Sequence, residues 1–316
     1  MIYDNSGAPN SISQPEDVFS NSQPDNGLIP MATKTEMVFF DEDELMEDPM
    51  KTEIVSDDLP VSVAMSSVIG KRKSQQDSVI IPDYKKITYD NKTRFICILS
   101  DGMGGLSGGE LASQTVTQNM FRDYYESVWK SDKPQYFDFL NREADKVNEK
   151  VLELTDENGN PLNAGATVVA VIVDENEMHF LNIGDSRIYI IRDGRIYQIT
   201  HDQNYFSVLM EKVNNEEITL EEAKSHPKRE ALISYCGIKQ LKIKEINLKP
   251  VQMKKGDAIL LCSDGLYRAL SDTEMCDIVS ASGRDSNIAA YKLIAAAMDK
   301  NYRGQDNTSV VLIKFI

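Results

Sequence analysis

Short apolar runs of strand length, interrupted by two long helical blocks, are the feature of this sequence that most constrains its fold. Apolar residues recur at helical spacing over 107–129 and 135–154, and two shorter helices fit 272–281 and 286–301. Many antiparallel strands with paired helices between them predict an α+β fold of layered sheets flanked by helices. An Asp193-Gly194 dipeptide inside one of the runs predicts a hairpin. The predicted strands are 61–69, 77–81, 94–100, 167–174, 177–184, 186–200, 241–248, 257–263 and 308–316.

Residues 1–60 differ from the rest of the chain in composition. They hold 14 acidic residues against Lys34 and Lys51, so they carry −12 of the total charge of −16, and the remaining residues carry only −4. Ser, Asn, Pro and Asp dominate this stretch, which includes the run "DEDELMED" at 41–48 and has no regular periodicity. We therefore predict a disordered acidic leader at 1–60 and a folded domain over 61–316.

The nearly neutral folded part argues against nucleic acid or an anionic membrane as the main partner, because no basic stripe is present. The longest apolar run, at 166–173, is far shorter than a membrane span. The first residues, "MIYDNSGAPNS", lack the pattern of a secretory signal. The four cysteines form no Cys-x-x-Cys pair and are expected to be reduced, buried thiols. These features predict a cytoplasmic protein.

Five aspartates stand at the ends of predicted strands. Asp101, Asp185 and Asp264 directly follow apolar runs, whereas Asp77 and Asp306 come just before them. If the first three strands run antiparallel to the last two, all five carboxylates reach the same rim of the sheets. A single Asp at a strand end is usually a turn residue, but five in one geometric class indicate a shared site. Several carboxylates together need a cation, and oxygen ligands favour Mg²⁺ or Mn²⁺.

The glycine-rich stretch after Asp101, "SDGMGGLSGGE", is not a nucleotide-binding loop, because it lacks the Gly-Lys-Ser/Thr ending. We expect Gly102 to let the main chain bend so that its carbonyl can face a cation, and Gly104 and Gly105 to keep the floor of a cleft free of side chains. Ser107 and Glu110 form a predicted capping box that starts the next helix.

A candidate phosphate ligand lies in "GKRKSQQD" at 70–77, where Arg72 stands five residues before Asp77. Arg can bind two phosphate oxygens at once through its planar guanidinium group. The neighbouring Lys71 and Lys73 are interpreted as surface residues.

These stretches together resemble the metal-dependent Ser/Thr protein phosphatases of the PP2C family, over nearly all of residues 61–316. Each stretch alone is weak evidence, but all seven occur in the family order. They are "GKRKSQQDS", "SDGMGG", "GATVVAVIV", "LNIGDSRIYIIRDGRIYQITHD", "ITLEEAKSHPKREALI", "DAILLCSDGL" and "DNTSVVLI".

The resemblance implies a four-layer αββα sandwich with two Mn²⁺ or Mg²⁺ ions between the sheets. Asp101 would bridge both ions, the carbonyl of Gly102 would join one, and Asp264 and Asp306 would complete the other. A hydroxide bridging two cations about 4 Å apart would then attack the phosphorus of phosphoserine or phosphothreonine in proteins.

The resemblance also assigns outer roles. Asp77 would act through water, Arg72 would hold the phosphate, and Asp185 would help bind a third, weaker ion beside Asp264. Residues 202–240 would form a flap that influences substrate choice. The implied setting is a cytoplasmic, bacterial-type monomer that opposes a cognate Ser/Thr kinase.

Three positions depart from the family pattern. Met103 stands where some members have a histidine that can serve as general acid, so the solvent would protonate the leaving group. Gln75 replaces a usual Asn and Gln203 a usual His. Two alternatives remain at this point: a pseudophosphatase that serves as a regulatory binding module, and a regulator whose leader docks a kinase or a small phosphoprotein.

Overall fold

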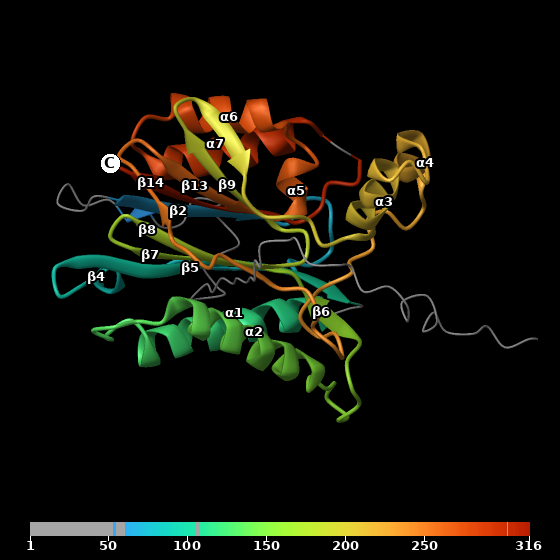
Figure 1. The fold of residues 1–316 in the computed structure, drawn as a ribbon, viewed down its shortest axis with the longest axis horizontal. Helices are drawn as coiled ribbons and strands as arrows, with labels where there is room; N and C mark the ends of the chain where they lie inside the picture. The colour runs from blue at the N-terminus through green and yellow to red at the C-terminus, as the bar shows by residue number, and fades with distance from the viewer. Residues whose placement is uncertain (1–52, 55–60, 105–107, 302) are drawn as a thin grey trace, which may run out of the picture.

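The fold has four layers, in which two antiparallel sheets pack face to face and helices cover both outer faces (Figure 1). The computed structural model describes residues 53–54, 61–104, 108–301 and 303–316. The predicted αββα sandwich is confirmed. The predicted leader at 1–60 lies outside the described residues, apart from a two-residue strand.

The first sheet has six strands in the order β1-β2-β14-β13-β9-β10, and each neighbouring pair is antiparallel. The predicted hairpin at Asp193-Gly194 joins β9 to β10, and both residues have the positive φ that such a turn requires. The strands are β1 (Glu53–Ile54), β2 (Val61–Val68), β9 (Arg187–Arg192), β10 (Arg195–Gln198), β13 (Ala258–Cys262) and β14 (Thr308–Phe315).

The second sheet runs in the order β11-β8-β7-β5-β3, with β12 paired to β8 and with β4 and β6 paired to β5. Its central strands read as continuous apolar runs because both faces of the sheet are covered. The strands are β3 (Asp77–Ile80), β4 (Thr88–Tyr89), β5 (Lys92–Gly104), β6 (Ala164–Ala166), β7 (Val168–Asp174), β8 (Glu177–Ile183), β11 (Glu245–Ile246) and β12 (Val251–Gln252).

Four helices cover the sheets and match the four predicted from periodicity. Helices α1 (Gly108–Ser127) and α2 (Tyr136–Leu152) lie below the second sheet in Figure 1, and α6 (Asp272–Ala281) and α7 (Ser286–Asp299) lie above the first. The larger apolar core fills the space between the two sheets and the space between the second sheet and helices α1 and α2. A smaller core lies between the first sheet and helices α6 and α7.

The structure adds elements that the periodicity did not predict. Helices α3 (Tyr205–Asn214) and α4 (Leu220–Ser225) form a lobe that projects beyond the sheets in Figure 1. Short helical turns occur at α5 (Asp264–Tyr267) and at the 3-10 helix η2 (Tyr84–Lys86). The predicted strand 241–248 is wrong in extent, since only β11 pairs with β8. Within the described part of the chain, no helix is both long and apolar enough to cross a membrane.

Candidate metal centre

The register of the second sheet places two of the predicted aspartates opposite each other. Strands β3 and β5 are antiparallel, and Asp77 and Asp101 are direct partners in this pairing. Asp77 is buried, and one of its carboxylate oxygens, Oδ2, accepts hydrogen bonds from the hydroxyls of Ser263 (2.8 Å) and Ser309 (2.7 Å). Ser309 lies in β14 and Ser263 directly follows β13, so this carboxylate joins the two sheets at the rim.

Two further aspartates come from the first sheet. Strands β13 and β14 are antiparallel, so the end of β13 lies beside the start of β14. Asp264 follows β13 as the first residue of α5, and Asp306 precedes β14 by two positions. The predicted strand polarity is therefore confirmed, and both sheets contribute carboxylates to the same end of the sandwich.

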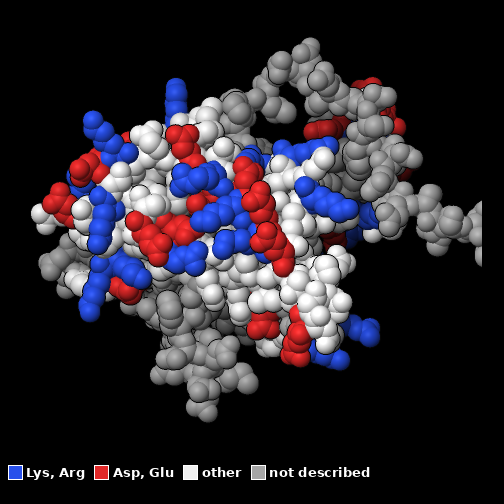
Figure 2. All heavy atoms as spheres, turned by 90° about the horizontal axis from the view of Figure 1, so that it is seen from below, with Lys and Arg blue, Asp and Glu red and all other residues white. Residues whose placement is uncertain are grey.

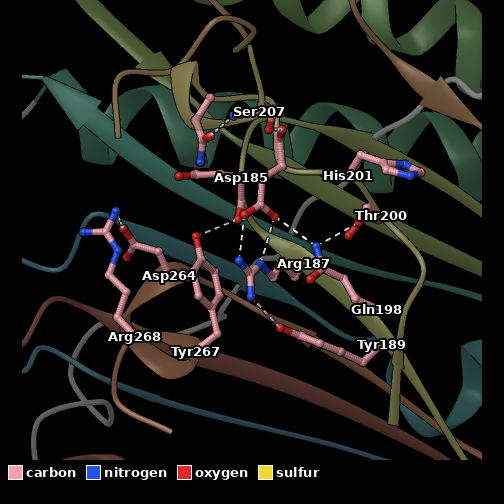
Figure 3. Close-up of polar contacts among 12 residues, drawn as sticks. Asp185, Arg187, Tyr189, Gln198, Thr200, His201, Ser207, Asp264, Tyr267 and Arg268 are labelled. Carbon is pink, nitrogen blue, oxygen red and sulfur yellow. Dashed lines mark hydrogen bonds and ion pairs between the residues drawn. The ribbon is translucent and has the colours of Figure 1, made fainter. Parts of the chain in front are cut away.

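Asp185 follows β8, which runs in the same direction as β5 because β7 is antiparallel to both. Asp185 is buried, and the hydroxyl of Tyr267 donates to its main-chain carbonyl at 3.0 Å. Figure 3 shows Tyr267 reaching from α5 toward Asp185, with Asp264 beside it.

The pKa values of these carboxyl groups show that they interact. Burial, followed by the charges of the other four aspartates, raises the pKa of Asp101 well above its usual value. Burial raises the pKa of Asp77 to about 7, against hydrogen bonds from two serines and with support from the charges of Asp264 and Asp306. Burial and neighbouring carboxylates likewise raise the pKa of Asp185 to about 7. For Asp264 the rise is to about 6, with burial as the largest cause.

The donor set fits a hard divalent cation. Every candidate side chain offers oxygen, and Oδ1 of both Asp77 and Asp264 is buried without a hydrogen-bond partner among the described residues. As the side chains stand, however, no three acidic, His or Cys groups within the described ranges enclose a metal position. Arg72 pairs with Asp306, and Arg268 pairs with Oδ2 of Asp264 at 2.9 Å. A cation at this rim would therefore compete with these two guanidinium groups.

Gly102 is required for a different reason from the one expected. It does not bend the chain, because β5 continues to Gly104 and pairs there with β6. A Cβ atom on Gly102 would overlap the carbonyl oxygen of Gly109 and lie 2.6 Å from that of Gln76. Glycine therefore lets the start of α1 pack directly against the strand. The predicted cap at Ser107 and the role of Gly105 lie outside the described residues.

Arg72 lies in the loop between β2 and β3, and Asn307 holds this loop in place. The Asn307 side-chain oxygen accepts from the main-chain N–H of Gln76 at 2.9 Å, and its amide donates to the carbonyls of Ile69 and Ser74. The Arg72 side chain is exposed and pairs with Asp306. The structure thus brings the predicted phosphate ligand to the rim that carries the aspartates.

Comparison with known proteins bears directly on this arrangement. A family model described as protein phosphatase 2C matches residues 69–290.

The chain belongs to the protein phosphatase 2C family.

This PP2C-family protein is 30% identical, over 227 residues, to the serine/threonine phosphatase stp of Listeria welshimeri. The match covers 72% of this chain and 87% of that protein. The solved serine/threonine phosphatase PstP/Ppp of Mycobacterium tuberculosis matches with a TM-score of 0.64 and 28% identity, covering 81% of this chain and 98% of that one. The PstP catalytic domain in complex with two manganese ions matches with a TM-score of 0.63 and 26% identity, covering 80% of this chain and 97% of that one.

The two glutamines that depart from the family pattern are both well satisfied in this PP2C-family protein. Gln75 accepts from the main-chain N–H of Asp77 at 3.0 Å and donates to Ser67. Gln203 is buried, accepts from the N–H of Gly184 at 3.0 Å, and donates to the carbonyl of Asn182. Gln75 therefore positions Asp77, and Gln203 fixes the start of the flap to the end of β8.

Sequence reasoning missed several residues that position the aspartates. The Thr167 hydroxyl accepts from the main-chain N–H of Asp101 at 3.0 Å, while the Thr167 N–H donates to the Asp101 carbonyl. Ser263 and Ser309 anchor Asp77 as described above, and Arg268 pairs with Asp264. The two serines stand beside strand ends in "CSDG" and "NTSVV". Each serine directly adjoins the apolar run of a strand, and this position was the signal available in the sequence.

Proposed function

We propose that this protein Ser/Thr phosphatase hydrolyses its phosphoserine and phosphothreonine substrates at the rim that carries Asp77, Asp101, Asp264 and Asp306. The observation that carries the proposal is the convergence of buried, mutually repelling carboxyl groups from both sheets beside one exposed Arg. Buried carboxylates that repel each other are stabilised by a bound cation, which supports a metal site at this rim.

In this proposal, Asp101, the carbonyl of Gly102, Asp264 and Asp306 hold two Mn²⁺ or Mg²⁺ ions. The Asp77 carboxylate acts through water, since its Oδ2 is already bonded to two serines. Asp185, with Asp264, holds a weaker third ion. When bound, such cations supply a water-derived nucleophile near neutral pH and offset the charge of the phosphoryl oxygens. The manganese-bound PstP structure supports the choice of Mn²⁺.

The protein's own side chains bind and orient the substrate. Arg72 is 55% exposed, so its guanidinium can exchange Asp306 for phosphoryl oxygens. Met103 cannot donate a proton, and the leaving serine or threonine oxygen therefore takes its proton from solvent. We also propose a monomeric, cytoplasmic protein that opposes a Ser/Thr kinase. Four buried free cysteines support a reducing compartment.

The experiment is turnover of an aryl phosphate and of a phosphothreonine peptide, with Mn²⁺ and then with excess EDTA. We expect activity with Mn²⁺ and its loss on chelation. Activity that survives EDTA would contradict the metal site. Calorimetric binding of Mn²⁺ without any turnover would contradict the assignment of catalysis to this rim. The named phosphatase relatives do not support the pseudophosphatase alternative.

A further inference from the structure

A cavity with charged residues in its lining lies beside the metal centre, between the flap and α5. Its volume is about 460 Å³, and residues of the flap line one side while α5 and its C-terminal neighbour line the other. The residues that matter for its chemistry are Phe206, Lys224, Arg229, Glu230, Tyr267 and Arg268. None of these residues belongs to the proposed metal-ligand set.

The guanidinium group of Arg268 connects the cavity to the metal centre, and Tyr267 makes a second connection through its hydrogen bond to the Asp185 carbonyl. Arg268 pairs with Asp264 at 2.9 Å and with Glu230 at 3.6 Å, so it joins a proposed metal ligand to the cavity wall. Figure 3 shows Arg268 beside Asp264, with Tyr267 between them and Asp185. A group bound in the cavity would therefore lie close to a phosphoryl group bound at the rim.

One side of the cavity is rigid and already neutral. Arg187 binds Asp202 through two hydrogen bonds of 2.8 and 2.7 Å, and its guanidinium carbon lies 3.6 Å from the centre of the Tyr267 ring. A bidentate pair stacked on an aromatic ring holds its geometry well. Arg187 is therefore part of the wall and is not available to a ligand.

The other side has an excess of positive charge. Lys224, Arg229 and Arg268 line it, and Glu230 is the acid between them. The other acid of the lining, Asp202, is bound by Arg187, and Asp264 at the rim pairs with Arg268. Glu230 pairs with Arg229 at 2.7 Å and with Arg268 at 3.6 Å. Lys224 reaches only Glu221, at 3.9 Å, and both of these side chains are largely exposed. An exposed pair of this kind is weak.

The position of Arg229 is fixed by the main chain around it. Its guanidinium donates to the Lys224 carbonyl at 2.9 Å, at the end of α4. Its own carbonyl accepts from the N–H of Phe206 at 2.8 Å, which ties it to the start of α3. The cationic side of the cavity is thus held by both flap helices.

We propose that this cavity binds an acidic side chain of the phosphoprotein substrate, close in sequence to the phosphorylated residue. The proposal rests on the proposed function and adds a preference among substrates. The incoming carboxylate takes the place of Glu230 on Arg229 and Arg268, and Lys224 adds a further charge. An extended chain advances about 3.3 Å per residue, so an acid two or three positions from the phosphorylated residue can reach the cavity.

The test uses phosphothreonine peptides that differ only by Glu or Gln at positions two and three residues to either side. The measured quantity is the ratio of kcat/KM for each Glu peptide to that for its Gln counterpart, with Mn²⁺ present. A charge-assisted hydrogen bond predicts a ratio on the order of tenfold at one position for the wild-type protein. We expect most of this preference in KM.

The variants are expected to change the Glu-to-Gln ratio of kcat/KM in opposite directions. Lys224→Gln and Arg229→Gln should bring the ratio close to one, whereas Glu230→Gln removes the internal competitor and should raise it. Lys212→Gln, an exposed flap residue outside the cavity, makes the same charge change and should leave the ratio as in the wild type. A loss of folding cannot mimic an increase in Glu230→Gln.

If the peptides are turned over but the Glu-to-Gln ratio of kcat/KM is one at every position, the acid-binding cavity is ruled out. The proposed function would stand. The same holds if Lys212→Gln lowers the ratio as much as Arg229→Gln does, since the effect would then be nonspecific charge. Absence of turnover of every peptide would overturn the proposed function, and this proposal with it.

Discussion

Two clusters of buried carboxyl groups in this molecule differ in how their negative charge is balanced. At the rim of the sheets, burial raises the pKa values of Asp77, Asp101 and Asp264, and neighbouring carboxylates add to the rise. The only cations paired there within the described residues are two arginines. Between α1 and α2, Asp123 and Glu143 also lie close together in the protein interior. The contrast lies in what balances their charge.

The helix pair is balanced locally. Burial raises the pKa of Glu143 to about 7, which favours its protonated form relative to an exposed glutamate. Burial alone would raise the pKa of Asp123, but hydrogen bonds from Lys146 and Glu143 outweigh it and lower that pKa. Lys146 pairs with both acids, Arg122 pairs with Asp123 at 3.1 Å, and Arg142 pairs with Glu143 at 3.5 Å, so three cations balance the pair. Figure 2 shows acidic and basic side chains intermingled over the face that α1 and α2 form.

The comparison teaches how to separate structural from functional carboxylates. Where the chain itself surrounds buried acids with basic side chains, as around Asp123 and Glu143, no ligand is needed. At the rim, the acids outnumber the cations that pair with them, and each of those cations is an arginine that can also bind substrate. The imbalance points to an ion from solution.

The largest expected effect comes from removing one carboxylate of the rim. Asp264→Asn should lower kcat/KM for an aryl phosphate with Mn²⁺ on the order of 10³-fold, because a lost metal ligand removes several kcal/mol of transition-state stabilisation. The far-UV circular dichroism spectrum should be unchanged. The matched control is Asp277→Asn, on the exposed face of α6, which should retain full activity. Activity within twofold of wild type in Asp264→Asn would mean that the metal site is elsewhere.

A second effect concerns protons at the same rim. Because the pKa values of Asp77 and Asp185 are raised to about 7 and that of Asp264 to about 6, protons compete with a cation as the pH falls through this range. We expect Mn²⁺ affinity to fall on the order of tenfold from pH 8 to pH 6. Titration calorimetry in buffers of different ionisation enthalpy should also show proton release on binding. Equal affinity at both pH values, without proton release, would contradict the shared site.

The smallest expected effect concerns the buried acids between α1 and α2. The raised pKa of Glu143 means that the folded state favours its protonated form, so the associated stability is present at acidic pH and is lost as the pH rises through about 7. Glu143→Gln cannot ionise and escapes this loss. Its unfolding free energy relative to wild type should therefore increase by about 1–2 kcal/mol between pH 5 and pH 8.

Urea denaturation at the two pH values measures this difference. The exposed Glu149→Gln on the same helix is the matched control and should show no such trend. If Glu143→Gln loses stability relative to wild type as the pH rises, the carboxyl group is not held in its protonated form.

Most of the fold could be predicted because its elements carry their own patterns. The prediction of a helix over 272–281 matches α6, and the strand at 177–184 differs from β8 by one residue. Elements that depend on tertiary pairing could not be found in this way. Strand β6 has three small residues and exists because Gly102 pairs with Ala166, and β12 is two residues held by β8. The flap helices lack a long apolar stripe and were not recognised.

The site was predictable to the level of strand polarity. The order of Asp and apolar run along the chain was enough to place Asp77 near Asp101, which the register confirms. Contacts between distant hydroxyls and carboxylates, such as Ser309 to Asp77, leave no local pattern because 232 positions separate the partners. The role of Gly102 was misjudged for the same reason, since it depends on a helix start packed against the strand.

The place of β14 in its sheet has a consequence for how the protein is made. This strand is the last of its sheet in chain order, yet it lies between β2 and β13. Strands β2 and β13 both pair with β14, so this part of the sheet cannot form until β14 has left the ribosome. Asp306 arrives just before it, and Ser309, which anchors Asp77, arrives within it. A partly synthesised chain therefore lacks both the middle of one sheet and two residues of the proposed metal rim.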